Sequence, residues 1–171
     1  MSQKIKTFLW FDKECEEAMN FYVETFNNAP HSKKNSKINF IARYEKGIEA
    51  PGAEEMDGKV ITGEFELDGQ KFQALDGGPI FKFNESVSLL VETEDQEETD
   101  YFWETFTKDG GQESQCGWLK DKYGMSWQIV PKRLTELAGD PDKEKSHRVV
   151  NCMLKMQKII IKDLEEAYKA G

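Results

Sequence analysis

The segment 115–131 constrains the fold more than any other part of the chain, because it contains two strand-like runs separated by a tight turn. It reads Q-C-G-W-L-K-D-K-Y-G-M-S-W-Q-I-V-P. Residues 121–124 have the composition of a turn, residues 125–130 alternate as a strand does, and Pro131 ends that strand. The pattern predicts paired strands that carry a cysteine, two tryptophans and a glutamine.

The first part of the chain predicts a strand, a helix and three further strands, in that order. Hydrophobic alternation places the strands at 4–11, 38–44, 60–67 and 70–75. Asp12 can cap a helix that reaches about Phe26. Asp68 and Gly69 are a two-residue hairpin signal, since a type I′ turn needs a positive φ at both positions.

The second part repeats this order after Asp76-Gly77-Gly78-Pro79. A strand is expected at 86–92, followed by a helix that Glu94 and Asp95 open and Gly110-Gly111 close, and then by shorter strands. The repetition predicts an α+β fold in one domain, residues 1–131, built from two βαβββ modules at about 4–75 and 85–131.

A helical extension, residues 132–171, is expected beyond Pro131. It begins with a short helix near 132–138, and Gly139-Asp140-Pro141 combines a helix stop with a new helix start. One long helix is then predicted to reach about Lys169, because its apolar residues are three and four positions apart. These residues are Val149, Met153, Met156, Ile160, Leu164 and Ala167. We expect this face to pack on the same domain or on a dimer partner.

Composition narrows the classes of partner. The 171 residues include 32 acidic and 23 basic side chains, for a net charge of -9, which disfavours binding to nucleic acid or to anionic lipid. No apolar run approaches the roughly 20 residues that cross a membrane. The three cysteines, Cys15, Cys116 and Cys152, are far apart and form no CxxC pair. We therefore expect a cytoplasmic protein with reduced thiols.

Strand alternation separates a helix-facing set of side chains from a set that lines a concavity. Ile61, Phe65 and Leu67, or Val87, Leu89 and Val91, should face the helices. The opposite face is expected to present Phe8, Trp10, Thr62, Glu64, Glu66, Gln73, Ser88, Ser126 and Gln128. This mixture of aromatic and polar groups is typical of a small-molecule site. The alternative is that these side chains face solvent or hydrogen-bond one another.

The sequence supplies few groups for metal or covalent chemistry. Its two histidines, His31 and His147, fall in a polar loop and at a helix start, outside the expected concavity. We therefore predict no metal site and no cofactor. Glu64 as a general base and Cys116 as a nucleophile are the candidate catalytic residues, although Cys116 has no histidine near it in the sequence.

Several motifs together resemble one family, the PhnB-like branch of the vicinal oxygen chelate superfamily, which also contains glyoxalase I and bleomycin-resistance proteins. The motifs are L-W-F-D at 9–12, E-E-A-M-N-F-Y at 16–22, F-E-L-D-G-Q-K-F at 65–72, D-G-G-P-I-F-K-F-N-E-S-V-S at 76–88, the run at 115–131, and M-L-K-M-Q-K-I-I-I-K-D-L-E-E-A-Y at 153–168. The resemblance implies paired βαβββ modules in a cupped, mostly antiparallel sheet, usually in a homodimer.

The resemblance also implies where a metal would be bound, and this sequence departs from that pattern. The superfamily's metal enzymes carry histidine or glutamate on the first, third, fifth and last strands. The corresponding positions here are Phe8, Thr62 or Glu64, Ser88 and Gln128, so at most one is a good ligand. Relatives are often labelled 3-demethylubiquinone 3-methyltransferase, but no glycine-rich motif for S-adenosylmethionine is present, which argues against that activity.

The leading hypothesis is a homodimer that binds a small organic molecule in its cupped sheets without a metal. Trp10, Trp118 and Trp127 are expected as walls, although alternation points Trp127 toward the helices. The polar groups that would orient the ligand are Glu64, Gln73 and Gln128. Two alternatives stay open: a metal-independent enzyme that uses Glu64 or Cys116, and a protein-interaction module that docks through the terminal helix.

Overall fold

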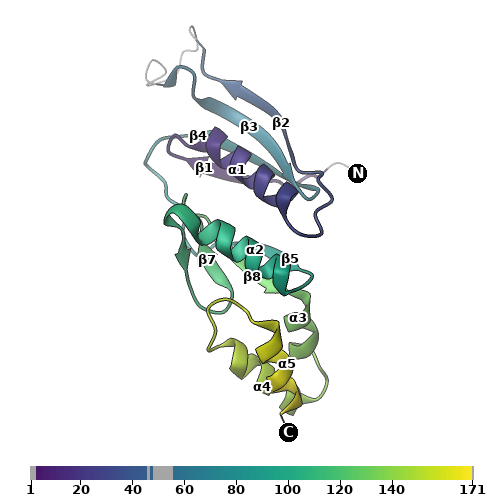
Figure 1. The fold of residues 1–171 in the computed structure, drawn as a ribbon. Helices are drawn as coiled ribbons and strands as arrows, with labels where there is room; N and C mark the ends of the chain where they lie inside the picture. Colours follow the sequence, from purple (N-terminus) through teal and green to yellow (C-terminus); the bar gives the residue numbers. More distant parts are fainter. Residues whose placement is uncertain (1–2, 46, 48–55, 171) are drawn as a thin grey trace. The chain divides into compact units, whose positions relative to one another are not determined.

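The computed structural model describes residues 3–45, 47 and 56–170, which form two compact units. Unit 1 contains residues 1–28 and 32–82, and unit 2 contains residues 29–31 and 83–171. Each unit has one four-stranded sheet with a long helix on one face (Figure 1). No helix in these described residues is both long and apolar enough to cross a lipid bilayer.

Unit 1 follows the predicted order of elements. It contains β1 (Thr7–Phe11), α1 (Cys15–Asn28), β2 (Lys37–Arg43), β3 (Val60–Leu67) and β4 (Gln70–Asp76). The strands lie in the order β1-β4-β3-β2, and β1 is parallel to β4 whereas the other pairs are antiparallel. Asp68 and Gly69 have φ values of 41° and 89°, which confirms the predicted turn between β3 and β4.

The core of unit 1 lies between α1 and one face of this sheet. Tyr22 of α1 stacks on Phe65 with ring centroids 6.3 Å apart, and Phe65 stacks on Phe72 at 5.2 Å. Asp76 is buried at the end of β4, where its carboxylate accepts hydrogen bonds from the backbone N–H of Cys15 (2.9 Å) and of Val60 (3.0 Å). This carboxylate therefore fixes the start of α1 against two strands.

Unit 2 repeats the arrangement with β5 (Leu89–Thr93), α2 (Gln96–Thr107), a 3₁₀ turn η2 (Lys108–Gly110), β6 (Gln112–Glu113), β7 (Trp118–Lys120) and β8 (Ser126–Pro131). Its strand order is β5-β8-β7-β6, with β5 parallel to β8. The predicted cap is confirmed, because the Asp95 side chain accepts from Glu98 N at 3.0 Å. The α+β fold class with two βαβββ modules is confirmed.

The structure corrects the predicted start of β5. The parallel ladder with β8 begins at Leu89, so the three residues before it lie outside the strand. Val87 is therefore 61% exposed and does not face the helix, in contrast to Val91, which is 9% exposed. The alternation of apolar residues therefore predicted the helix-facing side chains correctly within β5, where the strand pairs with β8, but not before it.

The structure also corrects the prediction of one long terminal helix. After α3 (Lys132–Ala138), the chain forms α4 (Lys143–Met153) and α5 (Ile161–Lys169), with a break between them. The break contains the start of an isoleucine run at 159–161, and β-branched residues are poor helix formers. Two carbonyl groups in the break, those of Met156 and Gln157, accept hydrogen bonds from residues 116–117 in place of N–H groups of a continued helix. A buried cluster holds the extension together: Leu134, Leu137, Val149, Ile159 and Leu164.

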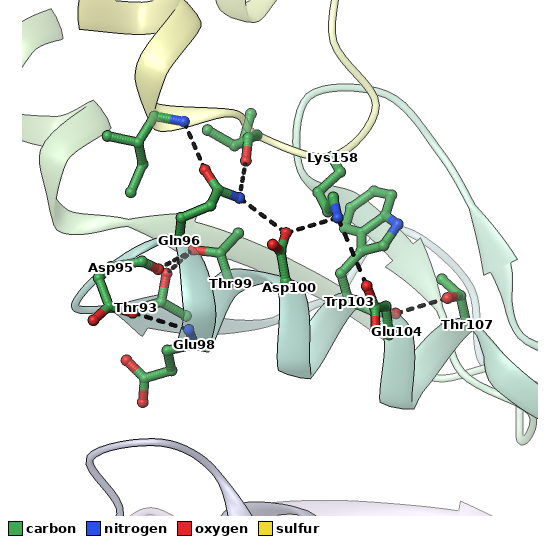
Figure 2. A network of polar contacts seen from close by, with 12 residues as sticks. Thr93, Asp95, Gln96, Glu98, Thr99, Asp100, Trp103, Glu104, Thr107 and Lys158 are labelled. Atoms are coloured by element: carbon green, nitrogen blue, oxygen red, sulfur yellow. Dashed lines mark hydrogen bonds and ion pairs between the residues drawn. The ribbon is translucent and has the colours of Figure 1, made fainter.

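We call residues 156–161 the C-terminal strap. The carbonyls of Met156 and Gln157 accept hydrogen bonds from the N–H groups of Cys116 (2.8 Å) and Gly117 (2.7 Å). The strap is also bonded to α2, because the amide of Gln96, labelled in Figure 2, donates to Ile159 O at 3.1 Å and accepts from Ile161 N at 2.8 Å.

An ion pair completes the attachment of the strap to α2. Lys158 Nζ lies 2.6 Å from an Asp100 carboxylate oxygen and 4.0 Å from one of Glu104 (Figure 2). The Gln96 amide also donates to Asp100 at 3.0 Å, so Asp100 joins both contacts. The helical extension is thus bonded to the first turns of α2 and to the turn at 115–117, both in unit 2.

Candidate functional site

The sheet face of unit 1 opposite α1 carries one row of side chains across all four strands. Gln73 pairs with Phe8 of β1 and with Glu64 of β3, and Glu64 pairs with Phe40 of β2. The two aromatic ends of the row are exposed, Phe8 by 50% and Phe40 by 45%. The structure thus brings together three of the predicted site residues and adds Phe40.

Glu64 is the charged centre of this row, and its carboxylate already has several partners. It forms an ion pair with Lys6, accepts a hydrogen bond from Asn39 Nδ2 at 3.0 Å, and lies 3.9 Å from Lys71 Nζ. The hydrogen bond from Lys6 is the main cause that lowers the pKa of Glu64, with Asn39 and the charge of Lys71 adding to it. A carboxylate stabilised in this way is a weak proton acceptor near neutral pH.

Trp10 lies on the same face of β1, against the chain that leaves β4. Its indole N–H donates to Gly78 O at 2.9 Å, and its ring meets Phe81 edge to face at 5.0 Å. A Cβ at Gly77 would lie 2.1 Å from the indole, so this close approach requires glycine. Trp10 and the exposed Phe81 form an aromatic surface, and Thr62 is half-buried on β3.

The described part of unit 2 contains a pocket of about 470 Å³ on the sheet face opposite α2. Its lining residues are Glu85, Gln112, Glu113, Ser114, Gln115, Cys116, Trp118, Leu119, Lys120 and Ser126. Lys120 of β7 pairs with Gln112 of β6 and with Ser126 of β8, which puts these three side chains in one row. Trp118, two residues before Lys120, is on the same face.

Ser126 gives this pocket an unusual chemical feature. Its side chain is buried at 1% exposure, and within residues 3–45, 47 and 56–170 its hydroxyl has no hydrogen-bond partner. A buried hydroxyl without a partner costs stability, on the order of 1–3 kcal/mol. Such a group is commonly explained by a role in binding a water molecule or ligand.

Glu85 and Lys120 form an ion pair in this pocket that the sequence did not predict. Glu85 comes from the irregular segment that precedes β5, 35 positions before Lys120 in the chain, so no local pattern signals the contact. The hydrogen bond from Lys120 is the main cause that lowers the pKa of Glu85. The Glu85 side chain is 64% exposed, compared with 31% for Lys120.

The remaining predicted residues of unit 2 separate into two groups. Gln128 pairs with Trp118 across β8 and β7, and its side-chain amide donates to Ser88 Oγ at 2.8 Å. Ser88 and Gln128 therefore bond to each other, which is the alternative considered from the sequence. Trp127 faces α2, where it is 1% exposed and stacks on Phe106 at 4.4 Å, so it is wrong as a ligand wall.

Cys116 lines the pocket, with a left-handed backbone conformation (φ 59°) in the turn that the strap holds. The two histidines are elsewhere. His31 Nε2 lies 2.8 Å from an Asp95 carboxylate oxygen, and His147 is exposed on α4. Activation of this thiol by a histidine base therefore has no support in the described structure.

The described residues also lack any group of three or more His, Cys, Asp or Glu side chains that could hold a metal ion. The positions that the superfamily resemblance assigns to metal ligands carry Phe8, Thr62, Ser88 and Gln128, together with Glu64. The Glu64 carboxylate is engaged by Lys6 and Asn39. This donor set does not fit a divalent metal such as zinc, nickel or iron.

Comparison with known proteins identifies the family. Residues 3–130 match the model of the 3-demethylubiquinone-9 3-methyltransferase family. A PhnB protein from Bacillus cereus, described by the same family name, is 35% identical over 75% of this chain and 99% of its own, with a TM-score of 0.63. This chain belongs to that family. The resemblance to PhnB-like proteins is thereby confirmed.

A more distant solved structure shows the fold alone. The PA1353 protein from Pseudomonas aeruginosa is 15% identical over 76% of this PhnB-like chain and 98% of its own, with a TM-score of 0.61. The fosfomycin resistance protein FosX from Listeria monocytogenes, solved with Mn(II) and sulfate, is 10% identical over 75% of this chain and 92% of its own, with a TM-score of 0.45. None of the curated proteins compared with the chain matches it.

Proposed function

We propose that this PhnB-like protein binds a small organic molecule on the sheet faces opposite α1 and α2, without a catalytic metal. The observation that carries the proposal is the unit 2 pocket, in which a buried Ser126 hydroxyl without a partner lies beside Trp118 and Lys120. Its volume of about 470 Å³ is within the range of small-molecule sites.

The chemistry of both faces favours binding over catalysis. Each face combines aromatic surface with a few polar groups, as small-molecule sites do. The lowered pKa of Glu64 makes this residue a poor general base, and Cys116 lacks a neighbouring histidine in the described residues. These observations support the binding proposal over the metal-independent enzyme considered from the sequence.

We extend the proposal to a cytoplasmic homodimer. Phe8, Phe40 and Leu90 expose 45–56% of their surface on the sheet faces, and a second copy of the chain would cover such apolar groups. The protein-interaction alternative has less support, because Met153 and Met156 of the extension pack against its own core. Light scattering after gel filtration tests the dimer, and a monomeric mass would refute it.

The binding proposal is tested by thermal shift with a panel of metabolites and drugs, with and without divalent metals. We expect an organic compound to raise the melting temperature and the metals to leave it unchanged. Trp118→Ala and Ser126→Ala should each weaken the response to that compound. A panel without any stabilising compound, or a response that both variants retain, would refute a site at this pocket.

A matched pair of serines provides the control. Ser126→Ala should leave the stability of the ligand-free protein unchanged or raise it, because the hydroxyl it removes has no partner in the described residues. Ser146 is also buried, but its hydroxyl donates to Ala138 O at 2.6 Å. Ser146→Ala should therefore cost about 1 kcal/mol of stability and leave the ligand response intact.

A further inference from the structure

The charged groups of the unit 2 pocket indicate which class of molecule it accepts. On the face opposite α2, the charges that line the pocket are Lys120 and Glu85. The remaining charged lining residue, Glu113, pairs with the buried Leu119, and its carboxylate accepts from Trp103 Nε1 of α2 at 2.8 Å. Glu113 is thus engaged on the helix side of the sheet.

The two partners of the Glu85–Lys120 ion pair differ in how firmly they are held. Lys120 is part of β7 and has hydrogen-bonded strands on both sides. Glu85 lies in the irregular segment before β5, next to the exposed Val87, and its own side chain is mostly exposed. Moving Glu85 away from Lys120 requires no change in the sheet, and exposed ion pairs of this kind contribute little stability.

We propose that the pocket binds a planar carboxylic acid, whose carboxylate replaces that of Glu85 on Lys120. This inference rests on the proposed function and adds the ligand class. The Ser126 hydroxyl, one strand away from Lys120 in the same row, supplies a second hydrogen bond to the acid. Trp118 lies on the same face and provides an apolar wall for the flat part of the ligand.

Glu85 then acts as an internal competitor. It neutralises Lys120 in the empty pocket, so that no unpaired charge is left in a site that is partly buried, and any acid must displace it to bind. Removing the Glu85 carboxylate should therefore strengthen the binding of acids and leave the binding of uncharged molecules unchanged. A tightening confined to acids distinguishes competition from a general change in the shape of the pocket.

The experiment measures benzoate and benzamide, two planar probes that differ in charge, by calorimetry with the full chain. We expect Glu85→Ala to bind benzoate roughly two- to fivefold more tightly, the effect of releasing one exposed ion pair. Lys120→Met should weaken benzoate binding by roughly tenfold or more, since it removes the charge that a carboxylate contacts. Benzamide affinity should change in neither variant, and added salt should weaken only benzoate.

Glu166→Ala is the matched control, because Glu166 also forms an exposed pair, with Lys162 at 3.8 Å, and changes the net charge equally. It should leave benzoate affinity unchanged. The inference is overturned if Glu85→Ala weakens benzoate binding, if Lys120→Met leaves it unchanged, or if benzoate binds to neither the wild type nor Glu85→Ala. Binding of benzamide without benzoate would overturn the acid class alone and leave the proposed function standing.

Discussion

The Asp121 carboxylate is predicted to be the main polar support beneath the unit 2 sheet, and Asp121→Asn tests this role. The side chain is buried at 2% exposure, directly after β7. One oxygen accepts from the backbone N–H of Tyr123 (2.9 Å) and Met125 (3.0 Å), and the other accepts from Trp127 Nε1 (2.8 Å). Asparagine keeps the shape but turns one acceptor into a donor.

The magnitude follows from these three contacts. The amide NH₂ of asparagine would face the Trp127 N–H, so one charge-assisted hydrogen bond worth about 1.5–3 kcal/mol is lost. The two bonds to backbone N–H remain but lose the charge that strengthens them. We therefore expect Asp121→Asn to lower the free energy of unfolding by about 2–4 kcal/mol.

Urea unfolding followed by circular dichroism at neutral pH measures this loss. Asp57→Asn, a change of the same charge at an exposed position, is the control and should cost less than about 0.5 kcal/mol. In a double-mutant cycle, Trp127→Phe should cost less in the Asp121→Asn protein than in the wild type, by about 1–2 kcal/mol. The reasoning would be refuted if Asp121→Asn and Asp57→Asn had the same free energy of unfolding. It would also be refuted if the losses caused by Asp121→Asn and Trp127→Phe simply added in the double variant.

Two further predictions concern ionisable groups. Burial is the main cause that raises the pKa of Cys15, to about 12, and it also raises the pKa of Cys152. Iodoacetamide at pH 8 should therefore label the partly exposed Cys116 first, Cys152 more slowly and Cys15 not at all in the folded protein, and should label all three thiols in urea, as read by peptide mass spectrometry. Labelling of Cys15 at the rate of the other two would contradict this. The hydrogen bonds and cations around Glu64 lower its pKa below the ordinary value of 4.5. The ionised carboxylate therefore stabilises the folded state above pH 4.5, and this stabilisation is lost as the pH falls through the lowered pKa of the folded state. The melting temperature of Glu64→Gln should therefore differ more from wild type at pH 7 than at pH 3, and an equal difference at both would count against the assignment.

The element order was predictable because it depends on local signals. The alternation of apolar residues, the Asp68-Gly69 turn and the Asp95 cap each involve neighbours in the sequence, and all three are found in the structure. The same alternation separated Trp127 from the face that carries Gln128. These patterns report which side of a strand or helix is buried, and this decides the fold class.

The remaining features depend on partners that are distant in the sequence. The β-bulge between Ile38 and Phe40 shifts the alternation of β2, so Phe40 joins the row of Glu64 without a sequence signal. The contact of Glu85 with Lys120 and the attachment of the strap to α2 and to residues 116–117 likewise depend on tertiary hydrogen bonds and ion pairs. Helix periodicity correctly marked Val149 and Leu164 as buried but could not reveal the interruption between them.

The strap has a practical consequence for anyone who isolates the family-matched region by itself. The family match stops at residue 130, whereas the N–H groups of Cys116 and Gly117 find their acceptors at Met156 and Gln157. A fragment cut at the family boundary would open the turn that lines the pocket and would uncover the side of α2 to which Ile159 and Lys158 attach. Because unit 2 also includes residues 29–31, the full chain preserves this unit, and the last forty residues should accompany the domain in any protein engineering.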